Sequence, residues 1–429
     1  MLLGQEMEKL KKIFLNTLYQ SIGKAATALI TIATTAVLSR NLGGAGFGDF
    51  AKITVFVGFF YLLADFGFNA IFLKESQDFK TFKIDLSRLF GLRIMLAGIL
   101  MLIAIVSGQL LPSFGKDSGF STTVKIGIAI FSLTIFLQAL ITCANAAFQF
   151  RLRYDRSVIS TVVGSLAGLI LVLLFRENLT VVLAVVIVAF ANLTAFIVAF
   201  MFLGRSYGFV NPIFDTNYIK GLFLKSWPLG LTLVFNVLYF RLDIIILALF
   251  RSSSEVGFYG LAYRIFENLI ALPIFFVNAL YPIWLADFAK DRKKFLLTFK
   301  TSILILAAGS LVVAGLIFLL ANFLVLLIGG VDFRPAGQLL QILLLGLPLF
   351  YLSAIFMWFL IVIGRQKLLP LIYGGGAVVN IGLNLIFIPK FGAAGAAAIT
   401  VVAEFLILAL LVTAAILNLK HVAVGKIQT

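Results

Sequence analysis

Residues 238–250 read LYFRLDIIILALF, an apolar run that is interrupted only by Arg241 and Asp243. The run ends a longer apolar stretch, 226–250, which is long enough to cross a bilayer as a helix. A charge at the centre of a membrane helix costs about 2.5–3.5 kcal/mol on insertion scales, so such residues are rare and usually face a polar cavity or a partner. Arg241 and Asp243 are therefore the clearest indication in the sequence of what the protein handles.

The rest of the chain has the same character. Of its 429 residues, 62% are hydrophobic and only 12% are charged, whereas soluble domains have about 45–50% and 25%. Apolar runs of ~20 residues predict an all-α integral membrane protein with about twelve transmembrane helices. The predicted spans are 14–38, 50–73, 86–111, 123–148, 157–175, 179–203, 226–250, 258–286, 296–320, 336–363, 368–388 and 396–417.

Lys and Arg residues separate between alternate gaps of this pattern. One set of gaps, with the two terminal segments, holds 22 of them, and the other set holds six. The six are Arg40, Lys116, Arg176, Arg251, Arg334 and Lys390. Positive charge marks the cytoplasmic side, so we expect a multi-pass protein of the cell inner (cytoplasmic) membrane with both termini cytoplasmic. The net charge of +16 is thus interpreted as topology, and no nucleic-acid partner is expected.

Enzymatic chemistry has little support in the sequence. No gap exceeds about two dozen residues, so a soluble catalytic domain has no room, and neither GxxxxGK[ST] nor HExxH occurs. Cys143 and His421 are the only residues of their types, which rules out an intrachain disulfide and argues against a cysteine or histidine metal site. We expect no catalytic residue, no metal and no cofactor.

An internal repeat organises the chain. Residues 40–51, RNLGGAGFGDFA, align without gaps with residues 251–262, RSSSEVGFYGLA, at an offset close to half the length. Six helices per half is an even number, so both halves enter the membrane in the same sense and are related by a pseudo-two-fold axis along the membrane normal. This predicts an N-terminal six-helix lobe at 1–204, a cytoplasmic linker at 205–225, and a C-terminal lobe with a short cytoplasmic tail at 226–429.

Polar residues at membrane depth are the candidate site. Arg241 and Asp243 are two residues apart and point roughly 200° away from each other on a helix, so we expect them to have separate partners. Arg264 and Glu267 are three apart and are expected to pair, whereas Arg40 and Arg251 at helix ends are expected to reach the membrane interface. The substrate-cavity candidates are Lys24, Arg93, Arg241, Arg264, Asn16 and Gln20. The acids that either couple an ion or pair helices are Asp65, Asp243, Glu267 and Glu404.

Three segments carry a family resemblance. They are LSRNLGGAGFGDFA (38–51), RLDIIILALFRSSSEVGFYGLAYRI (241–265) and PKFGAAGAAAIT (389–400). Together they resemble the polysaccharide-export flippases of the MOP superfamily, in particular the Wzx-type flippases of O-antigen and other lipid-linked oligosaccharides. The resemblance implies two six-helix lobes around a central cavity. Of the candidate residues, only Arg241 and Asp243 are carried over by a matching motif.

The resemblance also implies a function. Such proteins move an undecaprenyl-pyrophosphate-linked oligosaccharide from the inner to the outer leaflet by alternating access, and cations in the cavity would meet the pyrophosphate. The implied partners are this substrate, membrane lipids and glycan polymerase machinery, and we expect the protein to function as a monomer. The main alternative is a cation-coupled MATE-like exporter of amphiphilic small molecules. A membrane-embedded glycan polymerase or ligase is disfavoured by the short outside loops.

Overall fold

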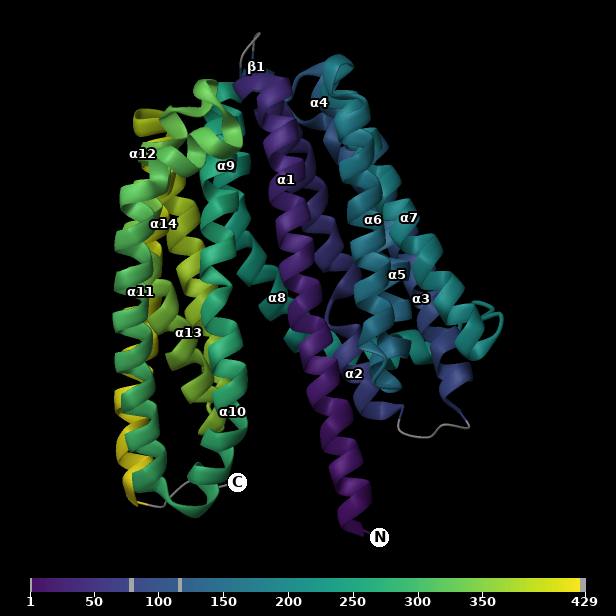
Figure 1. Ribbon diagram of the computed structural model, residues 1–429, viewed down its shortest axis with the longest axis vertical. Coiled ribbons are helices and arrows are strands. Elements are labelled where there is room, and N and C mark those ends of the chain that lie inside the picture. The colour runs from purple at the N-terminus through teal and green to yellow at the C-terminus, as the bar shows by residue number, and fades with distance from the viewer. Residues whose placement is uncertain (1, 77–80, 115–117, 425–429) are drawn as a thin grey trace. The chain divides into compact units, whose positions relative to one another are not determined.

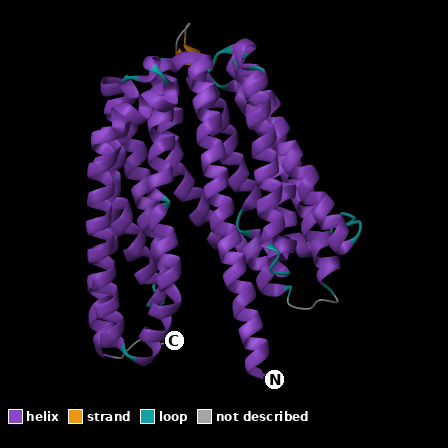
Figure 2. Cartoon of the chain, viewed as in Figure 1, coloured by secondary structure: helices purple, strands orange, loops and turns teal. Residues whose placement is uncertain are grey.

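Apolar runs become helices here because a helix keeps its backbone hydrogen bonds within the segment, which a bilayer demands. The computed structural model describes residues 2–76, 81–114 and 118–424. Over these ranges the chain is almost entirely helical, with a single two-stranded hairpin (Figures 1 and 2). The chain divides into two compact units, Met1–Val234 and Phe235–Thr429.

The N-terminal unit contains long helices joined by short turns. Its α6 packs against α1 and α7, and α5 packs against α3 and α7. The elements are α1 (Leu2–Asp65), α2 (Phe68–Glu75), α3 (Phe82–Leu110), β1 (Ser113–Phe114), β2 (Ser118–Gly119), α4 (Thr122–Phe131), α5 (Leu133–Phe150), α6 (Tyr154–Leu174), η1 (Arg176–Asn178) and α7 (Val181–Tyr207).

The C-terminal unit has the same character. Its α13 packs against α14 and α11, and α12 packs against α9 and α11. The elements that follow α7 are α8 (Thr216–Phe250), α9 (Ser253–Ile270), α10 (Leu272–Lys290), α11 (Arg292–Gly329), η2 (Val331–Phe333), α12 (Pro335–Leu345), α13 (Leu347–Val362), η3 (Gln366–Leu368) and α14 (Leu369–Val424).

The helices are long enough to cross a membrane many times. Among the described residues nine helical segments are long and apolar enough to cross a membrane, and α8, broken near its middle, adds a tenth. Two of the nine, Ile22–Glu75 and Gln366–Leu419, are 54 residues long, and a non-helical glycine, Gly43 or Gly392, divides each into two arms. At 1.5 Å per residue each segment has a path length of roughly 80 Å, more than twice the ~30 Å hydrocarbon core, so its two arms are long enough for two crossings. The predicted all-α membrane fold is confirmed.

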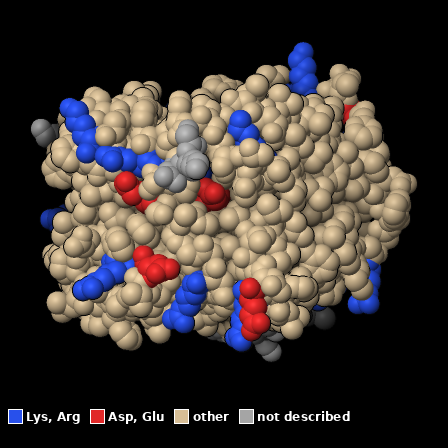
Figure 3. Space-filling model, turned by 90° about the horizontal axis from the view of Figure 1, so that it is seen from above, with Lys and Arg blue, Asp and Glu red and all other residues tan. Residues whose placement is uncertain are grey.

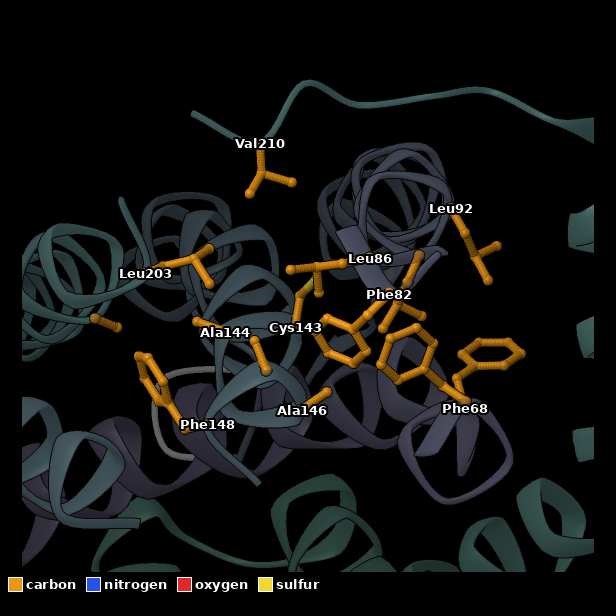
Figure 4. Packing of buried hydrophobic residues seen from close by; sticks show 14 of the residues in the cluster. Phe68, Phe82, Leu86, Leu92, Cys143, Ala144, Ala146, Phe148, Leu203 and Val210 are labelled. Carbon is orange, nitrogen blue, oxygen red and sulfur yellow. The ribbon is translucent and has the colours of Figure 1, made fainter. Parts of the chain in front are cut away.

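The core of the N-terminal unit is a cluster of aromatic and small side chains contributed by α2, α3, α5 and α7 (Figure 4). Phe82 stacks on Phe150 with ring centroids 3.7 Å apart, and Cys143 lies buried as a free thiol among these side chains. Alanines at 144, 146 and 147 let α5 approach its neighbours closely, which is the packing that membrane helices favour.

The division between the units falls inside α8. The first part of this helix packs on the N-terminal unit: Phe66 stacks on Phe223 at 5.1 Å, and Lys225 pairs with Glu75 at 2.5 Å. The non-helical connection before α8 spans only 208–215, so much of the segment predicted as a linker, 205–225, is helical. The exact lobe boundary stays a prediction.

Side chains at the turn between α8 and α9 form hydrogen bonds with the backbone at the break in α14. Arg251 donates from Nε to the carbonyl of Ile388 at 3.1 Å and from Nη2 to that of Pro389 at 3.0 Å. The Glu255 carboxylate accepts from the amide of Ala393 at 3.1 Å. Thus one side chain caps the end of the first arm of α14 and the other caps the start of the second arm. The sequence suggested only that Arg251 reaches the membrane interface. In the structure it also bonds the backbone of α14.

Figure 3 shows a mainly uncharged surface on which basic and acidic side chains form small separate groups. The hairpin β1–β2 lies in a gap between predicted spans that the alternation of Lys and Arg assigns to the outside of the cell.

Replacing Gly392 with alanine should destabilise the protein. Gly392 has φ 59°, a left-handed conformation that side chains disfavour by roughly 1–2 kcal/mol, and an added Cβ would lie 2.2 Å from Oε2 of Glu255. We expect the free energy of unfolding to fall by about 1–3 kcal/mol, seen as a lower midpoint of thermal unfolding in detergent. Gly382→Ala is the matched control, because it lies in the same helix and its Cβ would have no neighbour within 4 Å. Equal midpoints for the two variants would contradict this account.

Candidate functional site

Arg93 lies in the interior of the N-terminal unit, where α1 gives way to α2. Its side chain is 0% exposed. Nη2 donates to Oδ1 of Asp65 at 2.9 Å and to Oδ1 of Asn69 at 2.8 Å, and Nη1 donates to the carbonyl of Ala64. The backbone here is broken by two left-handed residues, Phe66 with φ 42° and Gly67 with φ 70°. The guanidinium therefore satisfies polar groups on both sides of the break.

In this arrangement Arg93 and Asp65 bond to each other, and Arg93 also bonds to other groups of its own unit. Their charges compensate each other, and Arg93 has no exposed surface from which to meet a substrate. The sequence grouped Arg93 with the cavity candidates because its depth in the third span was clear. The face on which it lies was not clear, since the residues next to it in α3 are apolar. Asp65 was expected either to couple an ion or to pair helices, and in the structure it forms an ion pair with Arg93.

Arg241 on α8 pairs with a carboxylate of the next helix. Its Nη2 lies 2.6 Å from Oε1 of Glu267 on α9, and the two side chains are 36% and 28% exposed. The sequence expected Glu267 to pair with Arg264 on its own helix; the structure shows an ion pair between Glu267 and Arg241 across the two helices. Arg264 is close enough for its charge to interact with both groups. Two guanidinium groups and one carboxylate are thus gathered at membrane depth.

Asp243 and Arg241 have separate partners in the structure. Its carboxylate is buried, with 1% of the residue exposed, and accepts hydrogen bonds from the hydroxyl of Tyr259 and from the amide of Ile244 at 2.7 Å. The hydroxyl of Tyr259 also lies 3.3 Å from Oγ1 of Thr400 on α14. Asp243 is thereby connected to α9 and α14 through neutral partners.

Glu404, in the second arm of α14, is another buried acid of the C-terminal unit. It accepts a hydrogen bond from the hydroxyl of Tyr239 at 2.7 Å. On the first arm of α14, buried Asn384 donates to Oδ1 of Asn380 at 2.9 Å. Within the described part of the chain, neither Asp243 nor Glu404 makes an ion pair with a Lys or Arg. The C-terminal unit therefore holds two buried carboxyl groups without a cationic partner.

The polar stripe of the first helix lies in α1. Lys24 is exposed and Gln20 is half-buried, while the side chain of Asn16 lies outside the described residues. The four-residue spacing of these positions holds in the structure, because α1 is helical over this whole stretch. Next to Lys24, Gly23 lies against Val158 of α6, where an added Cβ would be 2.3 Å from Cγ1.

Sequence reasoning missed several polar residues that the structure uses. Lys52 is 1% exposed, lies 3.2 Å from Oδ1 of Asp49, and donates to the carbonyl of Gly119 at 2.9 Å, so it holds the hairpin against α1. An aspartate three residues before a lysine at a helix end was the available signal. Tyr239 and Tyr259 were missed too, although a buried tyrosine hydroxyl needs a partner.

Two family profiles match the sequence. The profile of the family described as polysaccharide biosynthesis protein matches residues 13–286, and the MatE profile matches residues 228–386. No protein with a curated function matches the chain in sequence.

Solved structures share the fold over nearly the whole chain. An inward-facing multidrug resistance MATE transporter of the MOP superfamily is similar at a TM-score of 0.74 and 14% identity, covering 94% of this chain and 96% of that one. The lipid II flippase MurJ in an inward closed conformation is similar at 0.74 and 15%, covering 96% and 94%. A MOP superfamily transporter from Pyrococcus furiosus gives 0.61 and 16%, with 96% of each chain covered.

At 14–16% identity these solved structures show that the chain shares their fold. The polysaccharide biosynthesis profile covers more than half of the sequence, including the α8–α9 segment with Arg241 and Asp243. The chain therefore belongs to the polysaccharide biosynthesis protein family.

Proposed function

We propose that the protein is a flippase that moves undecaprenyl-pyrophosphate-linked oligosaccharide from the inner to the outer leaflet by alternating access between its halves. Two findings support a lipid-linked glycan as the substrate class. The family profile over residues 13–286 is that of polysaccharide biosynthesis proteins, and a lipid II flippase shares the fold. Wzx-type flippases are the members of this superfamily that the three sequence motifs resemble.

The observation that carries the proposal is the group formed by Arg241, Arg264 and Glu267. A pyrophosphate entering a membrane protein needs cations that replace its water, and an arginine fork matches phosphate oxygens in a bidentate manner. Arg241 is partly exposed and has one carboxylate partner, so a phosphate can compete with Glu267 for its guanidinium. Arg93 is less suited to this role, since its guanidinium is fully buried and bonded to three groups of its own unit.

The first helix carries a further set of candidate substrate contacts. Lys24 is an exposed cation on α1, and Gln20 one turn earlier provides an amide that can bind sugar hydroxyls. We propose that Lys24, Gln20 and Asn16 contact the glycan or the pyrophosphate.

Asp243 and Glu404 are proposed to couple transport to an ion gradient. A buried carboxylate without a cationic partner is costly when it is ionised, so it gains from binding a proton or a metal cation. Tyrosine hydroxyls hold both carboxyl groups in the C-terminal unit. Protonation or cation binding would therefore change the hydrogen bonding between α8, α9 and α14.

A second candidate function is a cation-coupled MATE-like exporter of amphiphilic small molecules. The MatE profile covers residues 228–386, which include Asp243 but not Glu404, and a MATE transporter shares the fold. The two functions differ in what a deletion strain loses. A glycan flippase predicts loss of surface glycan, whereas an exporter predicts raised drug accumulation with intact glycan.

Arg241→Ala and Lys24→Ala should each reduce glycan export while the amount of protein in the membrane is unchanged. Loss of one charge-assisted contact costs about 1.5–3 kcal/mol, which corresponds to roughly a tenfold loss or more. Surface glycan, measured by electrophoresis of cell-envelope extracts, is the readout. Arg176→Ala is the control, because Arg176 is an exposed residue of η1 whose only ion pair among the described residues is 3.9 Å long. Normal export in both Arg241→Ala and Lys24→Ala would refute the cationic site.

Asp243→Asn should preserve the fold and weaken the dependence of transport on a gradient. Asparagine keeps the size of the side chain and still accepts a hydrogen bond from Tyr259, but it cannot be ionised. We expect export in vesicles to respond several-fold less to an imposed proton or sodium gradient. Asp155→Asn, at the start of α6, is the control, since Asp155 pairs with Arg153 at 2.8 Å outside this network. An unchanged gradient response in Asp243→Asn would remove this residue from the coupling proposal.

A further inference from the structure

A groove of about 490 Å³ lies at one end of the C-terminal unit, away from the charged groups of α8 and α9. Its walls are the first turns of α14 on one side and the last turns of the same helix, after its return, on the other side. Leu371, Ile372, Leu410 and Leu417 make the walls apolar. A volume of this size is typical of sites that bind a small molecule or a lipid chain.

The groove exists because the two arms of α14 do not stay in contact along their length. They meet closely at Gly376, where an added Cβ would lie 2.6 Å from Cγ1 of Ile407. Beyond this point, toward residues 368–372 on one arm and 410–418 on the other, the space between the arms is open. Leu371 and Leu417 are 74% and 67% exposed, so the rim of the groove is hydrophobic.

The mouth of the groove is basic. Helix α13 ends at Val362, Gly364 turns the chain with φ 76°, and Arg365 and Lys367 then line the groove. Neither residue makes an ion pair within the described part of the chain. From residue 333 to the C-terminus the sequence contains one acid, Glu404, which is buried against Tyr239. The positive charge at the mouth is therefore not neutralised by the protein.

We propose that this groove binds one anionic phospholipid, with an acyl chain along Leu371, Ile372, Leu410 and Leu417 and the phosphate between Arg365 and Lys367. An apolar groove that opens at a membrane-spanning helix pair faces hydrocarbon, so a lipid chain is the occupant that is always present. Basic pockets between membrane helices bind anionic headgroups. The site is separate from the proposed transport site and does not depend on the identity of the transported substrate.

Native mass spectrometry of the full chain in detergent tests the headgroup. With dioleoyl phosphatidylglycerol added, we expect one lipid to remain bound, and with dioleoyl phosphatidylcholine, which has the same chains, about tenfold weaker retention. Arg365→Gln together with Lys367→Gln should remove this preference. Lys290→Gln together with Lys293→Gln is the matched control, because it removes two exposed charges elsewhere on the predicted cytoplasmic side and should leave the preference intact. Equal retention of the two lipids by the unaltered protein would overturn the proposal.

A second pair of variants tests the acyl chain. Ala414 lines the groove, so Ala414→Trp should fill it and lower phosphatidylglycerol binding although both basic residues are present. Val402→Trp places the same side chain on an exposed position of the same arm and should bind normally. Thermal unfolding midpoints of all variants confirm that they are folded.

Competitors identify the ligand class. Glycerol phosphate at the same concentration should not displace the lipid, and displacement would show a phosphate site without a chain requirement. Undecaprenyl phosphate bound in preference to phosphatidylglycerol would show a place for the substrate tail instead, and would contradict the phospholipid proposal. Because these readouts measure binding and not export, they stand or fall separately from the flippase function.

Discussion

The structure depends on one constraint: a polar group inside a bilayer must find its partner within the protein. Each break in a membrane helix exposes backbone groups, and charged side chains satisfy them. Arg93 serves the α1–α2 break, and Arg251 and Glu255 serve the break in α14. These charges are therefore part of the scaffold. Their cost is offset because each one replaces hydrogen bonds that the helix has lost.

Arg241, Asp243 and Glu404 differ from these residues, because, within the described part of the chain, they do not bond the backbone at a helix break. Arg241 pairs with Glu267 near Arg264 and is partly exposed, while Asp243 and Glu404 have only neutral donors. The first group suits an anionic ligand, because it contains two guanidinium groups. The two acids suit a proton or a metal cation. Arg241 of the first group and Asp243 of the second lie two residues apart in α8. One helix therefore contributes to both proposed roles, and a movement of this helix would affect both.

The sequence was sufficient for the crossings and for the breaks, because both depend on local signals. Apolar runs located the helices, and Gly43 and Gly392 lie where a left-handed residue allows the chain to turn. The direction of a charged side chain could not be predicted where its neighbours in the helix are apolar. Arg93 and Arg241 both lie within predicted spans, yet one is fully buried and the other is not. Only tertiary packing separates them, and tyrosine partners such as Tyr259 carried no distinctive pattern.

The first part of α8 has a consequence for dividing the chain. The predicted repeat places this helix at the start of the second lobe, yet its initial part packs on the N-terminal unit, through Phe223, Lys225 and Leu229. The predicted lobe and the compact unit therefore differ by this part of the helix, because the N-terminal unit extends to Val234. A cut at residue 226 would leave Phe223 and Lys225 on one fragment and Leu229 on the other, so fragments that keep each unit whole must be divided after Val234.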